Sequence, residues 1–377
     1  MMLRWPFAAL ALAACTSDAP PPPDQPGDEW DQKLNDRVVD YNAALRIAAL
    51  RLTGELPTIA EMGAVATAGD PKTAYETQLH TYLASPKFTR QIFHYWQDTL
   101  KLGDDPDFDS VAAFAAEVTV NNRPFTDIFT ATTGTCPTID PTTFQITPAD
   151  CTNGVPVHAG VLTTPGMNRS FVSNFGFRRV RWVQETFACT AFPAEISTVG
   201  QDVGGATPYT GMFPFDSLPS TPDQGKGGLG RVNFEDVSAV ICANCHTNIN
   251  HIAPLFGHFD PNGQYSANIV ATTPLPNNPV AVMTDYLAPG QGLAWRHDKP
   301  ITDFPSLGAA IAADPVASSC VISRLWNWAL GKADIIDDGY RVPADTIDAQ
   351  VQLFTASGMH LKDAIFNIFT SDDFVRF

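Results

Sequence analysis

Residues 242–246 read Cys-Ala-Asn-Cys-His, and this pentapeptide constrains the chain more than any other segment. On a helix, positions i, i+3 and i+4 share one face, so Cys242, Cys245 and His246 point the same way. Two thiols followed by an imidazole at this spacing form the attachment signature of a c-type haem. The thiols add to the haem vinyl groups, and the imidazole ligates the iron from the proximal side. We therefore expect one covalent haem c.

The CxxCH motif has three other interpretations: a disulfide, a zinc knuckle and a redox-active dithiol. Zinc needs two more ligands at a suitable spacing. His251 and His258 follow too closely to supply the usual second pair, and the chain has no second CxxC. A thioredoxin-like dithiol should follow a strand, whereas residues 234–241 have the pattern of a short helix. Covalent haem is the interpretation that these spacings favour.

The N-terminus has the pattern of an export signal. A charged start is followed by a short apolar stretch, residues 5–12, and then by small residues up to Cys15. Leu-Ala-Ala-Cys resembles a bacterial lipobox, so we expect a signal peptide over residues 1–14 and lipidation of Cys15. A membrane anchor is the alternative, but the apolar stretch is shorter than the roughly 20 residues that span a bilayer. Residues 15–30 follow as a proline-rich linker.

An exported chain with a lipid anchor belongs in the cell envelope, in the periplasm or at the outer membrane. The residues directly after Cys15 lack an Asp retention signal, which favours the outer membrane. Export also agrees with the CxxCH motif, because haem is attached to this motif outside the cytoplasm. Two separate sequence features therefore indicate one compartment.

The cysteine count supports an oxidising compartment. Seven cysteines are present, and removing the lipidated one and the two that bind haem leaves an even remainder. We expect two disulfides from that remainder. Cys136 and Cys151 bracket a loop and are predicted to pair, and Cys189 with Cys320 then follows by elimination. Four buried free thiols are the alternative.

The charge of the chain excludes one class of partner. Asp and Glu number 40 against 23 Lys and Arg, a formal charge of −17. A nucleic-acid-binding protein needs a basic face, so we expect no nucleic acid partner. An acidic surface suits a redox partner protein with a basic surface. The alternative is that the charge serves solubility alone.

The hydrophobic pattern predicts a mainly α-helical protein with a haem segment and long irregular loops. Helical spacing begins at residue 31 as one helix that ends at Gly54, and it recurs through residues 58–132. Residues 260–300 have an irregular pattern, and helical spacing resumes after Asp314-Pro315. We expect an N-terminal helical domain over 31–132, a disulfide loop and haem domain over 133–270, and a C-terminal helical region over 271–377.

The sixth ligand of the iron is an open question in the sequence. A Met opposite His raises the reduction potential, a second His lowers it, and an open position allows peroxide or oxygen chemistry. Met283, 37 residues after His246, is our candidate for the distal ligand. The alternative is that Met283 is an ordinary packing or surface residue.

Three arginines precede the haem segment. Arg178, Arg179 and Arg181 could pair with haem propionates, since Arg suits bidentate carboxylate contact. The alternative, which we favour, is a solvated cationic face of a helix.

The chain resembles the planctomycete and myxobacterial cytochrome-c-like proteins, whose component domains are largely of unknown function. The segments that carry the resemblance are Ala159–Pro165, Arg178–Cys189, the CxxCH motif, Phe259-Asp260, Gly263–Tyr265, Arg51–Gly54 with Pro57-Thr58, Ala329–Lys332 and Thr370–Phe374. His251 departs from the family pattern, which has an acidic residue near that position. The resemblance implies haem binding and an envelope location, and it implies no substrate.

These observations predict a lipid-anchored, single-haem c-type cytochrome-like protein that transfers electrons in the bacterial cell envelope. One alternative is a peroxidase-like haem enzyme with an open distal site. Another is an envelope binding or scaffold lipoprotein in which the haem is structural. Electron transfer is favoured over catalysis, and no catalytic residue is assigned, because the chain carries no nucleophile motif and no nucleotide fingerprint.

Overall fold

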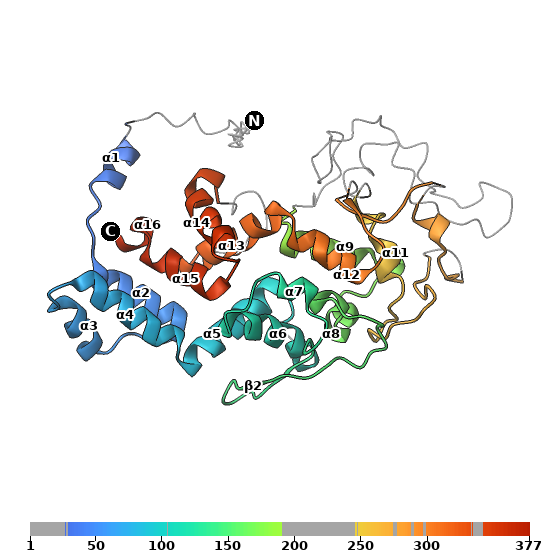
Figure 1. The fold of residues 1–377 in the computed structure, drawn as a ribbon, viewed down its shortest axis with the longest axis horizontal. Helices are drawn as coiled ribbons and strands as arrows, with labels where there is room; N and C mark the ends of the chain where they lie inside the picture. Colours follow the sequence, from blue (N-terminus) through green and yellow to red (C-terminus); the bar gives the residue numbers. More distant parts are fainter. Residues whose placement is uncertain are drawn as a thin grey trace, which may run out of the picture.

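The structure is a computed structural model that describes residues 27, 29–103, 105–190, 246, 248–273, 277–287, 290–296, 299–332, 334 and 342–377. Within these ranges the protein is mainly α-helical, as the sequence predicts (Figure 1). The α-helices are α1 (Glu29–Asn35), α2 (Tyr41–Thr53), α3 (Ile59–Ala66), α4 (Pro71–Leu83), α5 (Pro86–Leu100), α6 (Asp109–Val120), α7 (Asp127–Thr130), α8 (Pro165–Ser170), α9 (Phe177–Phe187), α11 (Ala253–Phe256), α12 (Phe304–Ala312), α13 (Pro315–Ala329), α14 (Ala344–Ala356), α15 (Leu361–Thr370) and α16 (Asp372–Val375).

Short 3-10 helices and two small antiparallel sheets connect the α-helices. The 3-10 helices are η1 (Pro106–Phe108), η2 (Gly160–Thr163), η3 (Asn174–Gly176) and η4 (Met283–Asp285). The strands are β1 (Thr138–Ile139), paired with β2 (Ile146–Thr147), and β3 (Ala294–Trp295), paired with β4 (Lys299–Pro300).

The ends of the N-terminal helices follow local sequence signals. Gly54 closes α2 at φ 76°, a left-handed conformation that glycine adopts without a steric penalty. Thr58 and Glu61 form the predicted capping box at the start of α3. Asp70 and Ser85 cap α4 and α5, and each precedes a proline in the first turn.

The first predicted helix is wrong at its beginning. Residues 31–53 form two helices rather than one, because Asp40 leaves the helix and caps α2 with its carboxylate. Val38 pairs with the C-terminal residue instead: its N–H donates to the carbonyl of Phe377 and its carbonyl accepts from the N–H of Phe377, both at 3.0 Å. Leu34 on α1, within the range of the single predicted helix, is 53% exposed.

The N-terminal and C-terminal helices pack together along most of the molecule (Figure 1). Helices α13 and α16 contact α2, and α15 contacts α4 and α6. The hydroxyl of Tyr75 on α4 donates to the carbonyl of Phe369 on α15 at 2.7 Å. The aromatic stripe of α5, including Phe88 and Trp96, is buried in this core, as predicted. Packing therefore crosses from the predicted domain 31–132 to the predicted region 271–377, whose boundaries stay a prediction.

Both predicted disulfide pairings are present in the structure. Cys136–Cys151 closes the loop that contains β1 and β2. Cys189–Cys320 ties the residues after α9 to the middle of α13 across 131 positions of sequence. The second disulfide fixes one end of the segment that leads toward the CxxCH motif.

Helix α12 lies just before the point, Asp314-Pro315, at which the sequence pattern predicts that helices resume. Asp303 and Ser306 form a capping box at its start, and Pro305 lies in its first turn. Gly308 packs against α7 so closely that an added Cβ would lie 2.2 Å from the carbonyl oxygen of Phe129. The close approach of two backbones explains why a short, glycine-containing stretch is helical here.

Among the described residues, no individual helix has both the length and the apolar character needed to cross a membrane. The bent pair α12 and α13 passes such a test jointly, by length and composition only, with an angle of 67° between its members. Its large apolar side chains, such as Leu307, Ile322 and Leu325, are buried in the protein core.

Candidate functional site

The candidate site is centred on His246, the first residue that the structure describes after the long segment 191–245. Cys242 and Cys245 lie in that segment, outside the described residues, as does the predicted lipidation site Cys15. The geometry of the site is therefore that of His246 and of the elements packed around it.

Asn250 holds the His246 ring in one orientation. The two residues are one helical turn apart, and the Nδ1 atom of His246 lies 2.9 Å from the Oδ1 atom of Asn250, whose side chain is buried. An amide oxygen only accepts hydrogen bonds, so Nδ1 carries the ring proton and donates it. In this tautomer the lone pair of the ring is on Nε2, and a neutral imidazole of this form can ligate a metal.

Burial also favours the neutral ring. The pKa of His246 is below its ordinary value, because its surroundings disfavour the charged imidazolium more than the bond to Asn250 supports it. A metal-binding histidine must be neutral. The ring of this residue is therefore in the protonation state and the tautomer that the predicted iron ligand requires.

An aromatic cluster borders His246 on the side of α9. The ring of Phe177 meets the imidazole edge to face, with 5.1 Å between centroids. Phe175 stacks on Phe177 at 5.3 Å, and Tyr286 packs edge-on against Phe175 at 5.2 Å. These rings come from the start of α9 and from the residue after η4, so two distant segments meet next to the histidine.

The start of α9 has an unusual backbone that brings this cluster together. Phe175 at φ 59° and Gly176 at φ 73° are consecutive left-handed residues. A bulky residue at positive φ is strained and persists only when its surroundings enforce it. Here the N–H of Phe175 donates to the carbonyl of Thr272, and a Cβ on Gly176 would lie 3.1 Å from the Cβ of Phe256. The turn lets α9 approach α11 directly.

Arg179 fastens the segment after the motif to α9. It is 1% exposed, and its guanidinium donates to the backbone carbonyls of Phe256, Phe259 and Asp260, each at 2.9 Å, and to that of Asn168 at 2.8 Å. Burial lowers the pKa of Arg179 to about 10. All four acceptors are main-chain oxygens, so one side chain determines the path of a turn without regular structure.

Neither role considered for the three arginines is right for Arg179. Arg179 is buried and bonded to the backbone, so it is neither part of a solvated face nor a partner for propionates. Arg178 is exposed and lies over the ring of Phe171. Arg181 forms an exposed ion pair with Glu185 at 2.6 Å. Of the three arginines, only Arg178 and Arg181 therefore lie on a solvated face of the helix.

The structure places Met283 at the start of η4. Its side chain is 45% exposed, and its carbonyl accepts the N–H of Tyr286 at 3.0 Å. Asp285 and Tyr286, rather than Met283, are the buried residues of this turn. The assignment of Met283 as distal iron ligand stays a prediction.

The other histidines of the region make local hydrogen bonds. Nδ1 of His251 lies 2.8 Å from the carbonyl of Gly292, and Nδ1 of His258 lies 2.9 Å from the carbonyl of Ser266. The described residues contain no group of three or more His, Cys, Asp or Glu side chains placed to hold a metal ion. Within the described residues, His246 is therefore not part of a metal site built from protein side chains alone.

Reasoning from sequence did not single out Asn250, Phe177 or Tyr286. Asn250 could have been found, because it is one turn after His246 on the same helical face. The two aromatic residues carry no local signal, since they reach His246 only through tertiary contacts.

Comparison of the chain with known protein families, with curated proteins and with solved structures gave no match. The function therefore rests on the residues themselves.

Proposed function

We propose that this protein is an exported, lipid-anchored, single-haem c-type cytochrome-like protein that transfers electrons in the bacterial cell envelope. One observation carries the proposal: the CxxCH motif ends in a histidine whose Nδ1 is bonded to Asn250, which supports the tautomer that has its lone pair on Nε2. The resemblance to planctomycete and myxobacterial cytochrome-c-like proteins agrees with it.

In this proposal Cys242 and Cys245 bind the haem covalently and His246 ligates its iron. The group supplies one-electron chemistry between ferric and ferrous iron. Asn250 fixes the imidazole and increases its basicity by accepting the Nδ1 proton in a hydrogen bond. Phe177 packs edge to face against the imidazole, and Tyr286 packs against Phe177 in turn.

The compartment is supported by the cysteine chemistry. Two disulfides are typical of proteins that fold in an oxidising environment. The signal peptide over residues 1–14 and the lipidated Cys15 would place the mature protein on a membrane by its N-terminus.

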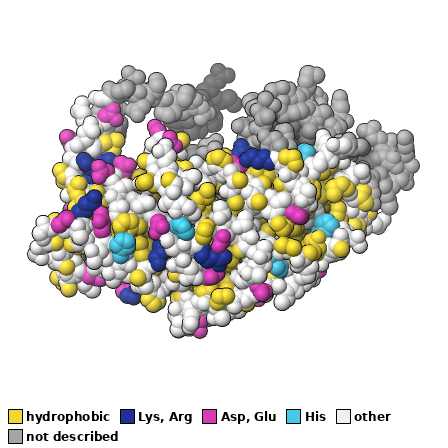
Figure 2. Space-filling view, viewed as in Figure 1, with side chains coloured by type: hydrophobic (Ala, Val, Ile, Leu, Met, Phe, Trp, Pro, Cys, Tyr) yellow, Lys and Arg dark blue, Asp and Glu magenta, His cyan; other side chains and the backbone are white. Residues whose placement is uncertain are grey.

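The proposed partner is a redox protein with a basic surface. Figure 2 shows acidic and basic side chains interspersed over one face of the described residues. The excess of acidic residues in the whole chain, 40 against 23, still attracts a basic protein over distances up to about 10 Å at moderate salt.

The test is to produce the full chain in an exporting host that has cytochrome c maturation machinery. We expect a denatured sample to retain a haem stain, and we expect the native protein to give a reduced-minus-oxidised spectrum with reversible oxidation. Replacing both Cys242 and Cys245 with Ala should abolish the stain. The matched control, Cys136 and Cys151 both replaced with Ala, removes a disulfide and should keep the stain.

A colourless wild-type protein would overturn the proposal. High-spin resting iron that binds cyanide quickly would overturn the electron-transfer assignment in favour of a haem enzyme. A haem that cannot be reduced within the physiological range of potentials would instead indicate a structural role.

A further inference from the structure

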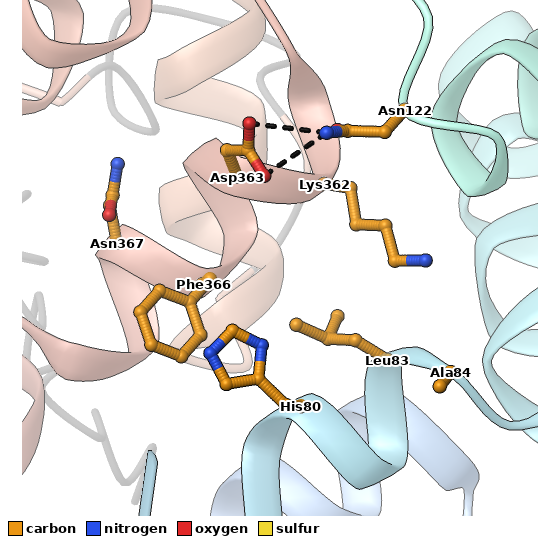
Figure 3. A pocket seen from close by; sticks show the side chains of 8 residues that line it. All are labelled: His80, Leu83, Ala84, Asn122, Lys362, Asp363, Phe366 and Asn367. Atoms are coloured by element: carbon orange, nitrogen blue, oxygen red, sulfur yellow. Dashed lines mark hydrogen bonds between the residues drawn. The ribbon is translucent and has the colours of Figure 1, made fainter. Parts of the chain in front are cut away.

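A hollow of about 450 Å³ lies apart from His246, where α4 and α6 end and α15 begins (Figure 3). This volume is within the range of sites that bind small molecules. The lining is about equally polar and apolar. The residues that line the hollow take no part in the proposed haem site.

One side of the hollow carries hydrogen-bond acceptors. Both carboxylate oxygens of Asp363 accept from the Nδ2 atom of Asn122 at 3.2 Å, and the Asp363 side chain is exposed. The Oδ1 atom of Asn122 is buried without a hydrogen-bond donor in the described structure. Because that oxygen is enclosed, the exposed carboxylate of Asp363 is the acceptor that a ligand can reach, and it favours a ligand that donates.

The opposite side is apolar and aromatic. The imidazole of His80 stacks on the ring of Phe366 with 4.4 Å between centroids and 16° between planes. Figure 3 shows these two rings and the side chain of Leu83 facing Asp363 across the hollow. A ligand that fits both sides has a polar donor at one end and an apolar body.

The ammonium group of Lys362 points away from the aromatic side of the hollow. The ammonium of Lys362 donates to the carbonyl of Val120, the last residue of α6, at 3.2 Å, and it lies 5.9 Å from the centre of the Phe88 ring. Figure 3 shows its end pointing away from His80 and Phe366. Burial lowers the pKa of Lys362 from its ordinary value.

The helix ends add to the negative potential. The C-terminal ends of α4 and α6, at Leu83 and Val120, carry partial negative charge. The N-terminal end of α15 carries the opposite sign, and Asp363 in its first turn compensates for it. An anionic ligand would therefore face a carboxylate and two negative helix ends.

We propose that this hollow binds a small organic amine, with its ammonium group on the carboxylate of Asp363. The alkyl body of the amine lies against Phe366 and Leu83.

Three probes with the same alkyl body test the proposal on the full chain: n-butylammonium, n-butanol and butyrate. Ligand-observed NMR titration measures their affinities. We expect n-butylammonium to bind and the other two to bind at least about tenfold more weakly, a difference of about 1.4 kcal/mol. Equal binding of the alcohol, preferential binding of butyrate, or no binding of the amine would overturn the proposal.

Two substitutions with opposite expected effects locate the site. Asp363→Asn keeps the size of the side chain and should weaken amine binding at least about tenfold, whereas Lys362→Met removes a competing cation and should strengthen it. Asp345→Asn, an exposed position on α14 outside the hollow, is the control and should change nothing. Amine affinity that is unchanged in the folded Asp363→Asn protein, or reduced in the folded Lys362→Met protein, would contradict the proposed site.

Phe366→Leu provides a variant that keeps an apolar side chain and removes the ring. We expect it to weaken amine binding several-fold, by the loss of aromatic surface that packs against the alkyl body. Thermal unfolding of each variant shows that it is folded before the titration is interpreted.

Discussion

The helical body and the surroundings of His246 are stabilised in different ways. In the body, long amphipathic helices such as α5 and α6 bury continuous apolar faces against each other. Around His246 the helices are short, and the path of the chain depends on single polar side chains that bind backbone carbonyls, above all Arg179. The first kind of stability is spread over many residues, and the second is concentrated in a few.

This difference has a consequence for mutation. A core substitution in the body removes apolar contacts from a packed interface whose other members remain. A substitution at Arg179 leaves several buried carbonyls without donors at one step, and each such group costs about 1–3 kcal/mol. Four predictions test the contrast, in order of the expected size of the effect.

Phe114→Ala should give the largest loss of global stability. Phe114 is fully buried at the centre of α6, and truncating a buried phenylalanine costs about 3–5 kcal/mol through lost burial and the remaining cavity. Chemical denaturation should show a lower midpoint for the whole protein. The control Val282→Ala, at a position 41% exposed, should change the free energy of unfolding by about 0.5 kcal/mol or less. Equal effects of the two substitutions would contradict the assigned core.

Arg179→Lys should reduce stability by about 3 kcal/mol, although it conserves the charge. A lysine cannot reach four carbonyls in separate directions, so the turn at residues 256–260 should lose protection from hydrogen exchange before the helical body does. The matched control is Arg181→Lys, in an exposed ion pair, with an expected change of about 0.5 kcal/mol or less. A mild effect at Arg179 would show that the turn is held by other contacts.

Asp314→Asn should remove part of the acid sensitivity of the protein. Burial would raise the pKa of Asp314, but hydrogen bonds from the indole N–H of Trp295 and the N–H of Val316, together with Arg296 and Lys299, outweigh burial and lower it. The ionised carboxylate therefore stabilises the fold above the pKa of the unfolded state, about 3.9, and this contribution is lost as the pH falls through the folded pKa.

Denaturation from pH 7 to pH 3 measures this contribution. The variant should lose about 1 kcal/mol at pH 7, where a helix cap is weakened, and should lose less stability on acidification than the wild type. Identical pH profiles for the two proteins would show that Asp314 does not contribute.

Substitutions of Asn250 should have the smallest effect on stability. Two of them should shift the reduction potential of the proposed haem in opposite directions. Asn250→Ala removes the acceptor for the Nδ1 proton, makes His246 a weaker donor to iron and should raise the reduction potential. Asn250→Asp strengthens the acceptor and should lower it. Potentiometric titration of both variants measures the shift, and shifts of equal sign would contradict the proposed tautomer.

The features that the sequence could predict are those that depend on neighbours in the chain. The glycine end of α2 and the capping box of α3 are determined within four residues. The CxxCH motif is likewise local. The split between α1 and α2 combines a local cap, Asp40, with the pairing of Val38 and Phe377, and the second contact cannot be seen in the local sequence.

The same limit applies to the candidate site. Arg178, Arg179 and Arg181 look alike in the sequence, yet only Arg179 points toward the turn of residues 256–260. The reason is tertiary: the left-handed turn at Phe175 and Gly176 determines which face of α9 meets α11. Arg179 is the structural anchor of the site, and no periodicity distinguishes it.

The most direct measurement is the mass of the proteolytic peptide that contains residues 242–246, taken from protein matured in an exporting host. The proposal predicts a peptide heavier by one haem, bound through both cysteines, with the iron on His246 in the intact protein. A peptide without haem, with its two thiols free or joined to each other, would contradict it.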